Sequence, residues 1–532
     1  SRSLTGHWSS AVQASDFYNM LLSTLLLATI FSTSSCSAAS ILALLPYNAR
    51  SHFVVMEPLV LELRRRGHHL TVVSSFPQLR PLENFTDVDF SSRLPSTISS
   101  YSLSSIKDKM PNMFRTAVFI TKIHLDVCEA VLEDSKLQSI LSKKFDLVIG
   151  EIFGADCFNY IAYKLNTPFI SWVTSTAQPW LAERTGLSDN PSYIPNYFVD
   201  YSAEMNFLDR FHNTITLVYA KFVYYFCSDL HSHYLAEKAF KETLPTMEEI
   251  NRLTSLVLVN SHFTLAQSRP FPPNVVEVAG IHIKETKPLP KDLQELLDSA
   301  KDGVILVSFG SLVRVSSLPP QVIRMFLDVF ATLPQRVVFK YEEDIPDVPP
   351  NIIIRAWLPQ TDIIAHPNVR LLITHCGLAS TIEAVNFAKP IVAVPFFSDQ
   401  FQNAKNLVRR GVAVMLDINN LSQQDISHKI NAVLSDPSYT ENMRRLSQQF
   451  RDRPMTALQT AVYWTEYVIR HQGAPHLRPA SVSLPLYQYL LLVLVSTLVA
   501  IILALYWFIT YLCSLICNKR TQIKLKDSNK SE

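Results

Sequence analysis

The chain has 532 residues, and once its two apolar ends are set aside roughly 440 remain, enough for about two ordinary domains. Its 48 lysines and arginines nearly balance 46 aspartates and glutamates, giving a net charge of +2. No bulk positive field is therefore present to hold a nucleic-acid backbone, and nucleic acid is not expected as a partner.

The first 39 residues are interpreted as a leader that lies outside the folded body. A short apolar run extends from Met20 to Phe31, and small residues follow it up to Ala39. This order is typical of a secretory signal peptide. A short buried helix is the weaker interpretation, because strand-forming sequence follows immediately.

Strands and helices are predicted to alternate from residue 40 to residue 283. An apolar strand at 41–46, a helix at 53–66 and a strand at 69–75 make one βαβ unit. The next predicted elements are a helical stretch at about 113–143, a strand at 145–150, a helix at 157–164 and a strand at 168–173. This alternation favours a parallel sheet covered by helices. Segment 174–250 is rich in Tyr, Phe and Pro, and we expect loops and helices there, beside a pocket or against a membrane.

A second domain is predicted at 284–445. Two prolines mark a linker at its start, and an apolar strand at 303–309 leads into Gly310 and Ser311. Further strands are predicted at 336–341, 352–356, 371–374 and 391–394. The sequence therefore predicts an α/β fold in which two doubly wound, Rossmann-like domains face a cleft. Ligands of such sheets bind at the carboxyl ends of the strands.

The chain after residue 445 is predicted to close the body and enter a membrane. Residues 446–485 are expected to form closing helices and a juxtamembrane segment. Segment 486–513 is apolar, and about 20 such residues are enough to span a membrane as a helix. The tail at 514–532 is basic, so the positive-inside rule puts it in the cytosol and the body in the lumen.

Sequons and cysteines give further expectations about that lumenal body. The sequons at Asn84 and Asn420 are candidate glycosylation sites, whereas the one at Asn529 falls on the cytosolic side. Four cysteines are scattered through the body, a spacing that predicts neither a disulfide framework nor a metal site. They are Cys128, Cys157, Cys227 and Cys376.

An anion-binding site is predicted where the segment Thr374–Thr381 follows a buried strand and opens a helix. Backbone N–H groups and the helix dipole converge there and favour negative charge. A diphosphate fits such a place, and we expect His375 to donate a hydrogen bond to it and to help carry the charge that develops on it during a reaction. The residues expected to form the site are Thr374, His375, Gly377, Ser380 and Thr381.

The longer stretch Trp357–Asn403 resembles the donor-binding signature of the UDP-glycosyltransferase family. This resemblance implies that Trp357 stacks on uracil and that Gln360 lies beside the base. It also implies that Glu383 accepts hydrogen bonds from the ribose hydroxyls. Asp399 and Gln400 are similar to the pair that holds the sugar hydroxyls.

Three other positions are compared with the same family. Ser311 resembles another phosphate contact, and Arg269 occupies the place of a family arginine near the donor. Cys376 stands where animal members usually have Gly and plant members commonly have Cys.

A catalytic base is expected in the first domain, since a glycosyl transfer without a metal needs a group that takes the proton of the acceptor hydroxyl. His52 lies in the loop after the first strand, where the family holds its catalytic histidine. A carboxylate should orient it. In a sheet of order 3-2-1-4-5 the end of the fourth strand lies beside this loop, which favours Glu151. Asp156 remains the second candidate, with a structural role at a helix N-terminus as its alternative.

The resemblance implies a GT-B type enzyme that moves a hexosyl group from a UDP-sugar to a hydroxyl of a small lipophilic acceptor, with inversion. No cofactor or metal is expected, since the UDP-sugar is a co-substrate. Segment Asp189–Tyr197 looks arthropod-like, which favours glucose over glucuronate. Segment 450–478 resembles the closing part of membrane-bound animal members, which implies a single-pass type I protein of the endoplasmic reticulum.

Two other functions stay open at this point. One is a non-catalytic lumenal binding protein with the same fold, and the other is a related sugar-nucleotide enzyme such as a lipid-glycan glycosyltransferase or an epimerase. A dehydrogenase is disfavoured, because no Gly-x-Gly-x-x-Gly loop follows either first strand. Assembly into a homo-oligomer is left open.

Overall fold

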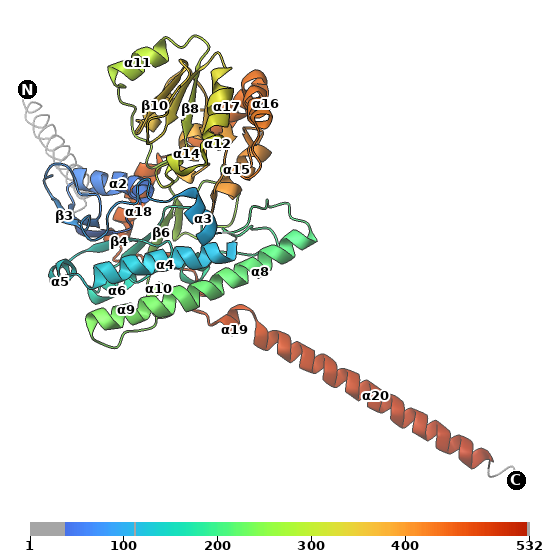
Figure 1. Ribbon diagram of the computed structural model, residues 1–532. Helices are drawn as coiled ribbons and strands as arrows, with labels where there is room; N and C mark the ends of the chain where they lie inside the picture. Colours follow the sequence, from blue (N-terminus) through green and yellow to red (C-terminus); the bar gives the residue numbers. More distant parts are fainter. Residues whose placement is uncertain (1–37, 111–112, 529–532) are drawn as a thin grey trace, which may run out of the picture. The chain divides into compact units, whose positions relative to one another are not determined.

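The computed structural model describes residues 38–110 and 113–528, and it divides into one unit up to Leu477 and a second from Arg478 (Figure 1). The predicted signal peptide, up to Ser37, lies outside the described residues, as does the sequon at Asn529.

The first half of the large unit is built on a parallel sheet with the order β3-β2-β1-β4-β5-β6-β7 among the described residues. Its strands are β1 (Ser40–Leu45), β2 (His69–Ser74), β3 (Phe85–Asp89), β4 (Leu147–Glu151), β5 (Phe169–Val173), β6 (Leu256–Val259) and β7 (Val275–Glu277). Strands β1, β4 and β5 are buried along almost their whole length, as expected for a sheet covered on both faces. Because β1 pairs with β4, with Leu44 opposite Gly150, the predicted 3-2-1-4-5 order is confirmed.

Helices cover both faces of this sheet. They are α2 (Arg50–Arg65), α3 (Leu103–Lys109), α4 (Met113–Leu132), α5 (Ser135–Leu141), α6 (Asn159–Lys164), α7 (Ala182–Thr185), α8 (Phe207–Val223), α9 (Leu230–Phe240) and α10 (Met247–Asn251). The single helix expected at 113–143 is two helices, since the Asp134 side chain accepts a hydrogen bond from the Lys136 N–H and caps a new helix. Within 174–250, α8 and α9 are joined by the π-helix η2 (Tyr224–Asp229) into one long rod.

The second half is built on a sheet with the order β10-β9-β8-β11-β12-β13 within the described part of the chain. Its strands are β8 (Val304–Ser308), β9 (Arg336–Lys340), β10 (Ile352–Arg355), β11 (Val369–Thr374), β12 (Ile391–Ala393) and β13 (Ala413–Met415). Its helices are α11 (Lys291–Asp298), α12 (Pro320–Ala331), α13 (Gln360–Ala365), α14 (Leu378–Asn386), α15 (Gln400–Arg409), α16 (Gln423–Ser435) and α17 (Pro437–Arg451). The prediction of two Rossmann-like domains is confirmed, and β13 is an edge strand that the sequence pattern did not predict.

Two crossings tie the halves together. Segment 99–110 leaves the first half and packs on the second: Tyr101 pairs with Val313, and Leu103 and Ile106 belong to the buried core around β8. Near the end of the unit, α18 (Ala457–Arg470) returns to the first half, where Glu466 forms an ion pair with Arg66 beside α2.

The small unit consists mainly of helices α19 (Leu486–Tyr489) and α20 (Leu492–Ser528). Residues Leu492–Thr521 are long and apolar enough to cross a membrane, by length and composition. The helix begins later than the span predicted at 486–513, because Leu491 has a left-handed φ of 53° that separates α19 from α20.

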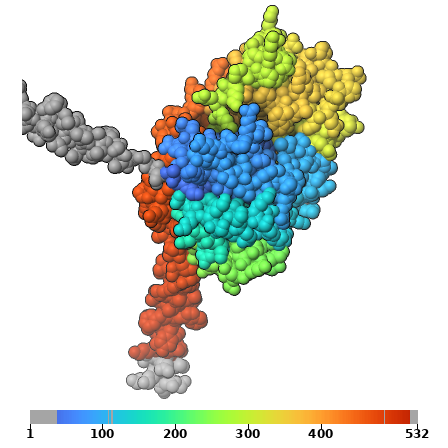
Figure 2. Space-filling model, turned by 90° about the vertical axis from the view of Figure 1, so that its left-hand side faces the viewer, coloured from blue at the N-terminus to red at the C-terminus, as the bar shows by residue number. Residues whose placement is uncertain are grey.

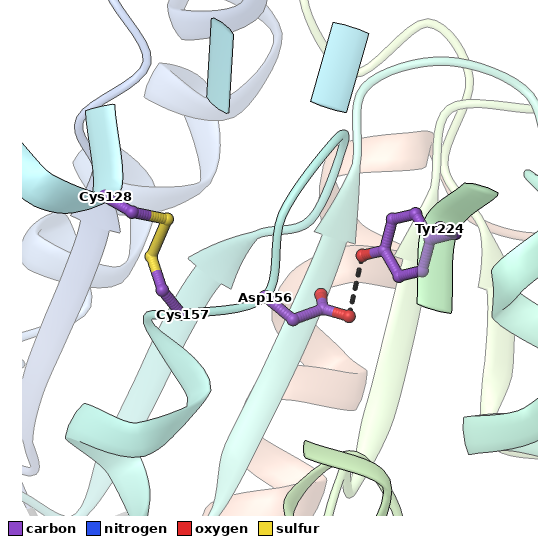
Figure 3. Close-up of a disulfide and its surroundings, with 4 residues drawn as sticks. All are labelled: Cys128, Asp156, Cys157 and Tyr224. Carbon is purple, nitrogen blue, oxygen red and sulfur yellow. Dashed lines mark hydrogen bonds between the residues drawn. A yellow bond between two sulfur atoms is a disulfide. The ribbon is translucent and has the colours of Figure 1, made fainter. Parts of the chain in front are cut away.

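A disulfide joins Cys128 on α4 to Cys157 in the segment between β4 and α6 (Figure 3). The expectation that the cysteine spacing implies no disulfide was therefore wrong. The two residues are 29 positions apart, and both are fully buried. Only the packing of α4 against the end of β4 brings them together, which spacing along the chain does not reveal.

Candidate active site

A cavity of about 370 Å³ opens between the carboxyl ends of the two sheets. Its lining includes residues that follow β1, β4 and β5 in the first half and residues at the ends of β8, β9 and β11 in the second. A site at this position agrees with the rule that parallel sheets bind ligands at the carboxyl ends of their strands.

His52 enters the cavity from the first turn of α2. Its Nδ1 contacts the Glu151 carboxylate, and Thr174 Oγ1 lies 2.9 Å from the same nitrogen while donating to Glu151 Oε1 at 2.8 Å. A carboxylate only accepts hydrogen bonds, so His52 donates from Nδ1 and its Nε2 keeps a free lone pair. Tyr47 and Phe153 meet the imidazole edge-on, with ring centroids 4.6 and 4.9 Å away, and restrict its orientation.

Glu151 is the last residue of β4, and its side chain is 3% exposed behind His52. Pairing of β4 with β1 explains the contact, because it sets the end of β4 beside the loop from which α2 begins. Of the two carboxylates considered from the sequence, the structure brings Glu151 to His52.

Asp156 lies elsewhere, in a buried polar cluster beside the disulfide. Its Oδ2 accepts from the Tyr224 hydroxyl at 2.7 Å (Figure 3). It also forms an ion pair with Arg184 and accepts from Asn251 Nδ2 at 3.1 Å. Asp156 and Arg184 are each 1% exposed. The cluster holds α7, η2 and α10 against the end of β4, so its geometry is that of a structural centre.

His375 comes from the second half, directly after β11. Its ring lies between Gly310 and Gly377, where a Cβ on either glycine would come within about 2.6 Å of a ring atom. Burial, with the nearby Lys340 ammonium adding to it, lowers the pKa of His375 to about 4, so the ring is neutral at physiological pH. Thr374, fully buried at the end of β11, places its Oγ1 3.3 Å from His375 Nδ1.

Gln360 organises the neighbouring side chains. Its Oε1 accepts from the Ser308 hydroxyl at 2.6 Å, and its Nε2 donates to Ser380 Oγ at 3.0 Å and to Glu383 Oε2 at 2.6 Å. Thr361 Oγ1 donates to the other Glu383 oxygen at 2.6 Å. Glu383 is thereby fixed at the cavity wall in α14, near Ser380.

Trp357 and Ser311 also line the cavity. The Trp357 side chain is 57% exposed, which leaves a ring face open for stacking. Ser311 is held by its backbone, whose carbonyl accepts from the Ser99 N–H at 2.8 Å. The hydroxyl of Thr381, by contrast, is buried beside a separate small cavity.

Asp399 and Gln400 stand at the start of α15. Burial raises the pKa of Asp399 to about 6. The hydrogen bond that its carboxylate accepts from Asn403 Nδ2 at 3.0 Å opposes this shift of the pKa. Gln400 Oε1 accepts from the backbone N–H groups of Phe396 and Phe397 at 2.8 and 3.2 Å, which fixes its side chain at the cavity wall.

Arg269 lies in a second, much smaller cavity of about 30 Å³. Its Nη2 donates to the Ser188 carbonyl at 3.3 Å, and its guanidinium is 5.6 Å from the Phe271 ring centroid. Burial lowers the pKa of Arg269 to about 10. The structure thus does not bring this arginine to the cavity that holds His52 and His375.

Lys340 is a cavity residue that the sequence analysis missed. It ends β9, donates from Nζ to the Gly310 carbonyl at 2.5 Å, and lies 5.3 Å from the centroid of the Trp357 ring. Burial lowers its pKa. A lysine at the carboxyl end of the predicted strand 336–341 was the available signal.

The first half adds a largely apolar surface to the cavity. It consists mainly of Ile106, Met110, Phe119, Ile120, Ile123 and Phe153. His124 lies among them, with Nδ1 2.8 Å from the Ile120 carbonyl, and burial lowers its pKa to about 4. This neutral histidine stacks on Tyr47 with centroids 4.3 Å apart, and it too was missed, because a histidine in a helix pattern carries no separate signal.

The fold and this cavity define a glycosyltransferase of the GT-B type. Among solved structures, the chain is similar to the kitacinnamycin glycotransferase, with a TM-score of 0.55, 17% identity, and coverage of 82% of this chain and 99% of that one. It is similar to the spinosyn forosaminyltransferase SpnP with a TM-score of 0.55, 16% identity, and coverage of 82% and 100%. At these identities the likeness concerns the fold.

The family model for UDP-glucoronosyl and UDP-glucosyl transferases matches residues 41–527. UDP-glucosyltransferase 2 of Dactylopius coccus is 40% identical over 495 residues, which cover 92% of this chain and 96% of that protein. UDP-glucuronosyltransferase 1A9 of Mus musculus is 30% identical over 508 residues, covering 91% and 93%. The chain belongs to the UDP-glycosyltransferase family, and it is an enzyme that uses a UDP-sugar.

Proposed function

We propose that this UDP-glycosyltransferase moves glucose from UDP-glucose to a hydroxyl of a small lipophilic acceptor, with inversion and without a metal. One observation carries the proposal: a single cavity is lined both by His52, backed by Glu151, and by the donor-signature residues around His375. The base and the donor side chains come from different halves of the unit, so the acceptor and the donor can meet between them.

In the proposed reaction, the proton of the acceptor hydroxyl passes to His52 Nε2, and Glu151 stabilises the imidazolium that forms. The acceptor oxygen bonds to the anomeric carbon while the bond from that carbon to the β-phosphate oxygen breaks, and UDP leaves. A single displacement inverts the anomeric centre. His375 and the backbone N–H groups at the start of α14 are proposed to stabilise the charge that develops on the diphosphate.

Two observations favour glucose over glucuronate. The relative that is 40% identical is named a glucosyltransferase, whereas the glucuronosyltransferase of mouse is 30% identical. Arg269, the arginine expected near the donor and able to pair with a sugar carboxylate, belongs to another cavity. The cations that line the main cavity are Arg50 and Lys340, and Lys340 stands beside the expected diphosphate site.

The acceptor is proposed to be lipophilic because of the apolar surface around Ile120 and Phe153. Such pockets bind apolar ligands mainly through area and use few polar groups to orient them. His52 supplies the polar contact at the reacting hydroxyl.

We further propose that the body lies in the lumen of the endoplasmic reticulum, anchored by α20 as a single-pass type I protein. Basic residues follow the span, which favours a cytosolic tail. The disulfide between Cys128 and Cys157 is typical of an oxidising compartment. Asn84 and Asn420 are exposed, as glycan acceptors must be.

The test is a donor panel of UDP-glucose, UDP-glucuronate and UDP-galactose against a mixed set of phenols, with UDP release and product mass as readouts. We expect the highest kcat/KM with UDP-glucose and a β-linked product by NMR. A preference for UDP-glucuronate would overturn the sugar assignment. Failure of every donor to release UDP in the presence of acceptors would favour the non-catalytic alternative.

A further inference from the structure

The two halves of the large unit meet along a boundary that Figure 2 shows from one side, where the blue part of the first half borders the yellow part of the second. Segment 194–201 of the first half, which lies between α7 and α8, also crosses to the second half. It contacts the start of α15 or the residues just before that helix at three places. The pairs are Tyr197 with Ser398, Asn196 with Gln402, and Asp200 with Lys405.

Segment 194–201 is fixed within the first half by one buried side chain of α8. Asn213 Oδ1 accepts from the backbone N–H and from Nδ2 of Asn196, both at 2.9 Å. Asn213 Nδ2 donates to the carbonyls of Pro191 and Ile194, both at 2.8 Å. An amide side chain has two donor hydrogens and two lone pairs, and all four are used here. The segment therefore reaches the second half in a conformation that the first half sets.

Tyr197 carries the contact that lies nearest to the expected sugar pair. Its side chain is buried and lines the main cavity, and its hydroxyl lies 3.2 Å from Ser398 Oγ. Burial and the nearby Asp399 carboxylate raise the pKa of Tyr197 well above its ordinary value, so the hydroxyl keeps its proton and can donate. The ring meets Phe153 edge-on, with centroids 6.5 Å apart, and Phe153 also restricts His52. One side chain of the first half thus touches both sides of the cavity.

Ser398 occupies a backbone conformation that needs support. Its φ of 56° lies in the left-handed region, which residues other than glycine rarely adopt. Such a conformation persists where the surrounding structure holds it. Ser398 directly precedes Asp399 and Gln400, whose side chains are held by groups of the second half. The Tyr197 hydroxyl adds a contact from the first half to this turn.

We propose that Tyr197 is a positioning residue for the donor sugar. Its hydroxyl holds the turn at Ser398, so that Asp399 and Gln400 are set for the sugar hydroxyls. This inference rests on the proposed function, in which Asp399 and Gln400 are the pair that holds the hydroxyls of a hexose. It assigns part of the selection of the sugar to the half that binds the acceptor. Segment Asp189–Tyr197, whose arthropod-like sequence favours glucose, ends on the residue concerned.

The test is isothermal titration calorimetry on the full chain in detergent micelles, with UDP-glucose and UDP as ligands. Tyr197→Phe removes only the hydroxyl, and the loss of its hydrogen bond to the turn should weaken UDP-glucose binding about fivefold. UDP lacks the sugar, so its affinity should stay within about twofold. Equal weakening for both ligands would give Tyr197 a general structural role and overturn the proposal. An unchanged affinity for UDP-glucose would overturn it too.

Tyr201→Phe is the matched control from the same segment. The Tyr201 hydroxyl lies 2.8 Å from His212 Nδ1 on α8, and Tyr201 is not part of the lining of the main cavity. Both affinities should therefore stay within about twofold in this variant. A loss of UDP-glucose affinity as large as that of Tyr197→Phe would contradict a specific role of Tyr197.

Ser398→Ala tests whether Tyr197 acts through its partner. If it does, the double variant Tyr197→Phe/Ser398→Ala should bind UDP-glucose about as weakly as either single variant, because the same hydrogen bond is lost in all three. Losses that multiply in the double variant would show that the two residues act independently, which overturns the proposal.

The donor panel described above separates a failure of this inference from a failure of the proposed function. If the parent chain prefers UDP-glucuronate or UDP-galactose, the assignment of glucose is wrong, and the preferred donor replaces UDP-glucose in the calorimetry. The parental preference thus tests the sugar, whereas the ratio of the affinities of variant and parent tests Tyr197.

Discussion

The donor side and the acceptor side of the cavity are assembled in different ways. Most donor-side residues come from one contiguous stretch, Trp357–Gln400, which passes successive strand ends of the second sheet. The acceptor side combines Tyr47 and His52 with Phe119–His124, Phe153 and Thr174, which lie on separate elements. A contiguous site is visible as a sequence motif, whereas a dispersed site becomes visible only when the sheet order is known.

The largest effect on turnover is expected for a substitution of His52, on the acceptor side of the cavity. His52→Ala should lower kcat about a thousandfold, because a positioned general base contributes 10²–10⁴. UDP affinity, measured by calorimetry, should stay within about twofold, since the groups expected to bind UDP are in the other half. A variant that keeps a tenth of the parental kcat would contradict the role of His52. A large change in UDP affinity would show that the acceptor side and the donor side of the cavity do not act separately.

Substitution of Glu151 should mainly lower turnover, whereas substitution of Asp156 should mainly lower stability. Glu151→Gln should lower kcat by at least about a hundredfold with a small change in stability, since it acts by orienting His52. Asp156→Asn should lower the free energy of unfolding by about 3–5 kcal/mol, because it leaves Arg184 buried without its charge partner. Denaturant unfolding and kcat per UDP-binding site separate the two effects. Loss of turnover with unchanged stability in Asp156→Asn would reverse the assignment.

On the contiguous side, Trp357→Ala should weaken UDP binding about 10–100-fold, in line with stacking energies of about 1–3 kcal/mol per base. Trp357→Phe should restore most of the affinity, because a phenyl ring can still stack. Fluorescence titration with UDP measures both. Equal affinities of the Ala and Phe variants would show that the exposed ring does not stack on the base.

The smallest effect is a pH dependence at Asp399. Below its pKa of about 6 the carboxyl is protonated, so one oxygen becomes a donor and the charged acceptor for the sugar hydroxyls is lost. KM for UDP-glucose should therefore rise several-fold between pH 7 and pH 5. Asp399→Asn should have a higher KM at pH 7 and a flat profile.

The raised pKa of Asp399 also predicts how the stability of the protein depends on pH. The folded pKa of Asp399 lies above its ordinary value of 3.8, so the native state holds the proton more tightly. Asp399 therefore lowers stability as pH rises from about 4 to about 6, and the Asn variant should lack that slope. A parental slope of the opposite sign that disappears in the variant would contradict the raised pKa.

The sequence predicted the parts of the fold that depend on local pattern. Buried strands such as β1, β4 and β8 were visible as short apolar runs. The place where the helix pattern at 113–143 breaks into α4 and α5 was not, because Asp134 acts as a cap only once the chain turns there. The disulfide and the Asp156 cluster were missed for a similar reason, since each depends on how helices pack against the end of β4.

For the site, the motif predicted most of the side chains that meet at the cavity from His375 to Gln400, with Thr381 as the exception. It did not predict that Arg269 would face another cavity. A resemblance to a family at one loop position does not determine the direction in which that side chain points. Lys340 was missed since it lies outside the contiguous stretch, on a strand that was predicted without its end being considered.

Segment 99–110 makes the second domain depend on the first for part of its own interior. Leu103 and Ile106 fill space in the core around β8, although they precede that strand by some 200 residues. A chimera that exchanges everything before residue 284 would place side chains from another protein inside this core. One that keeps 99–110 matched to the second domain would leave that interior intact and would transplant the rest of the apolar cavity surface, from Phe119 to Phe153.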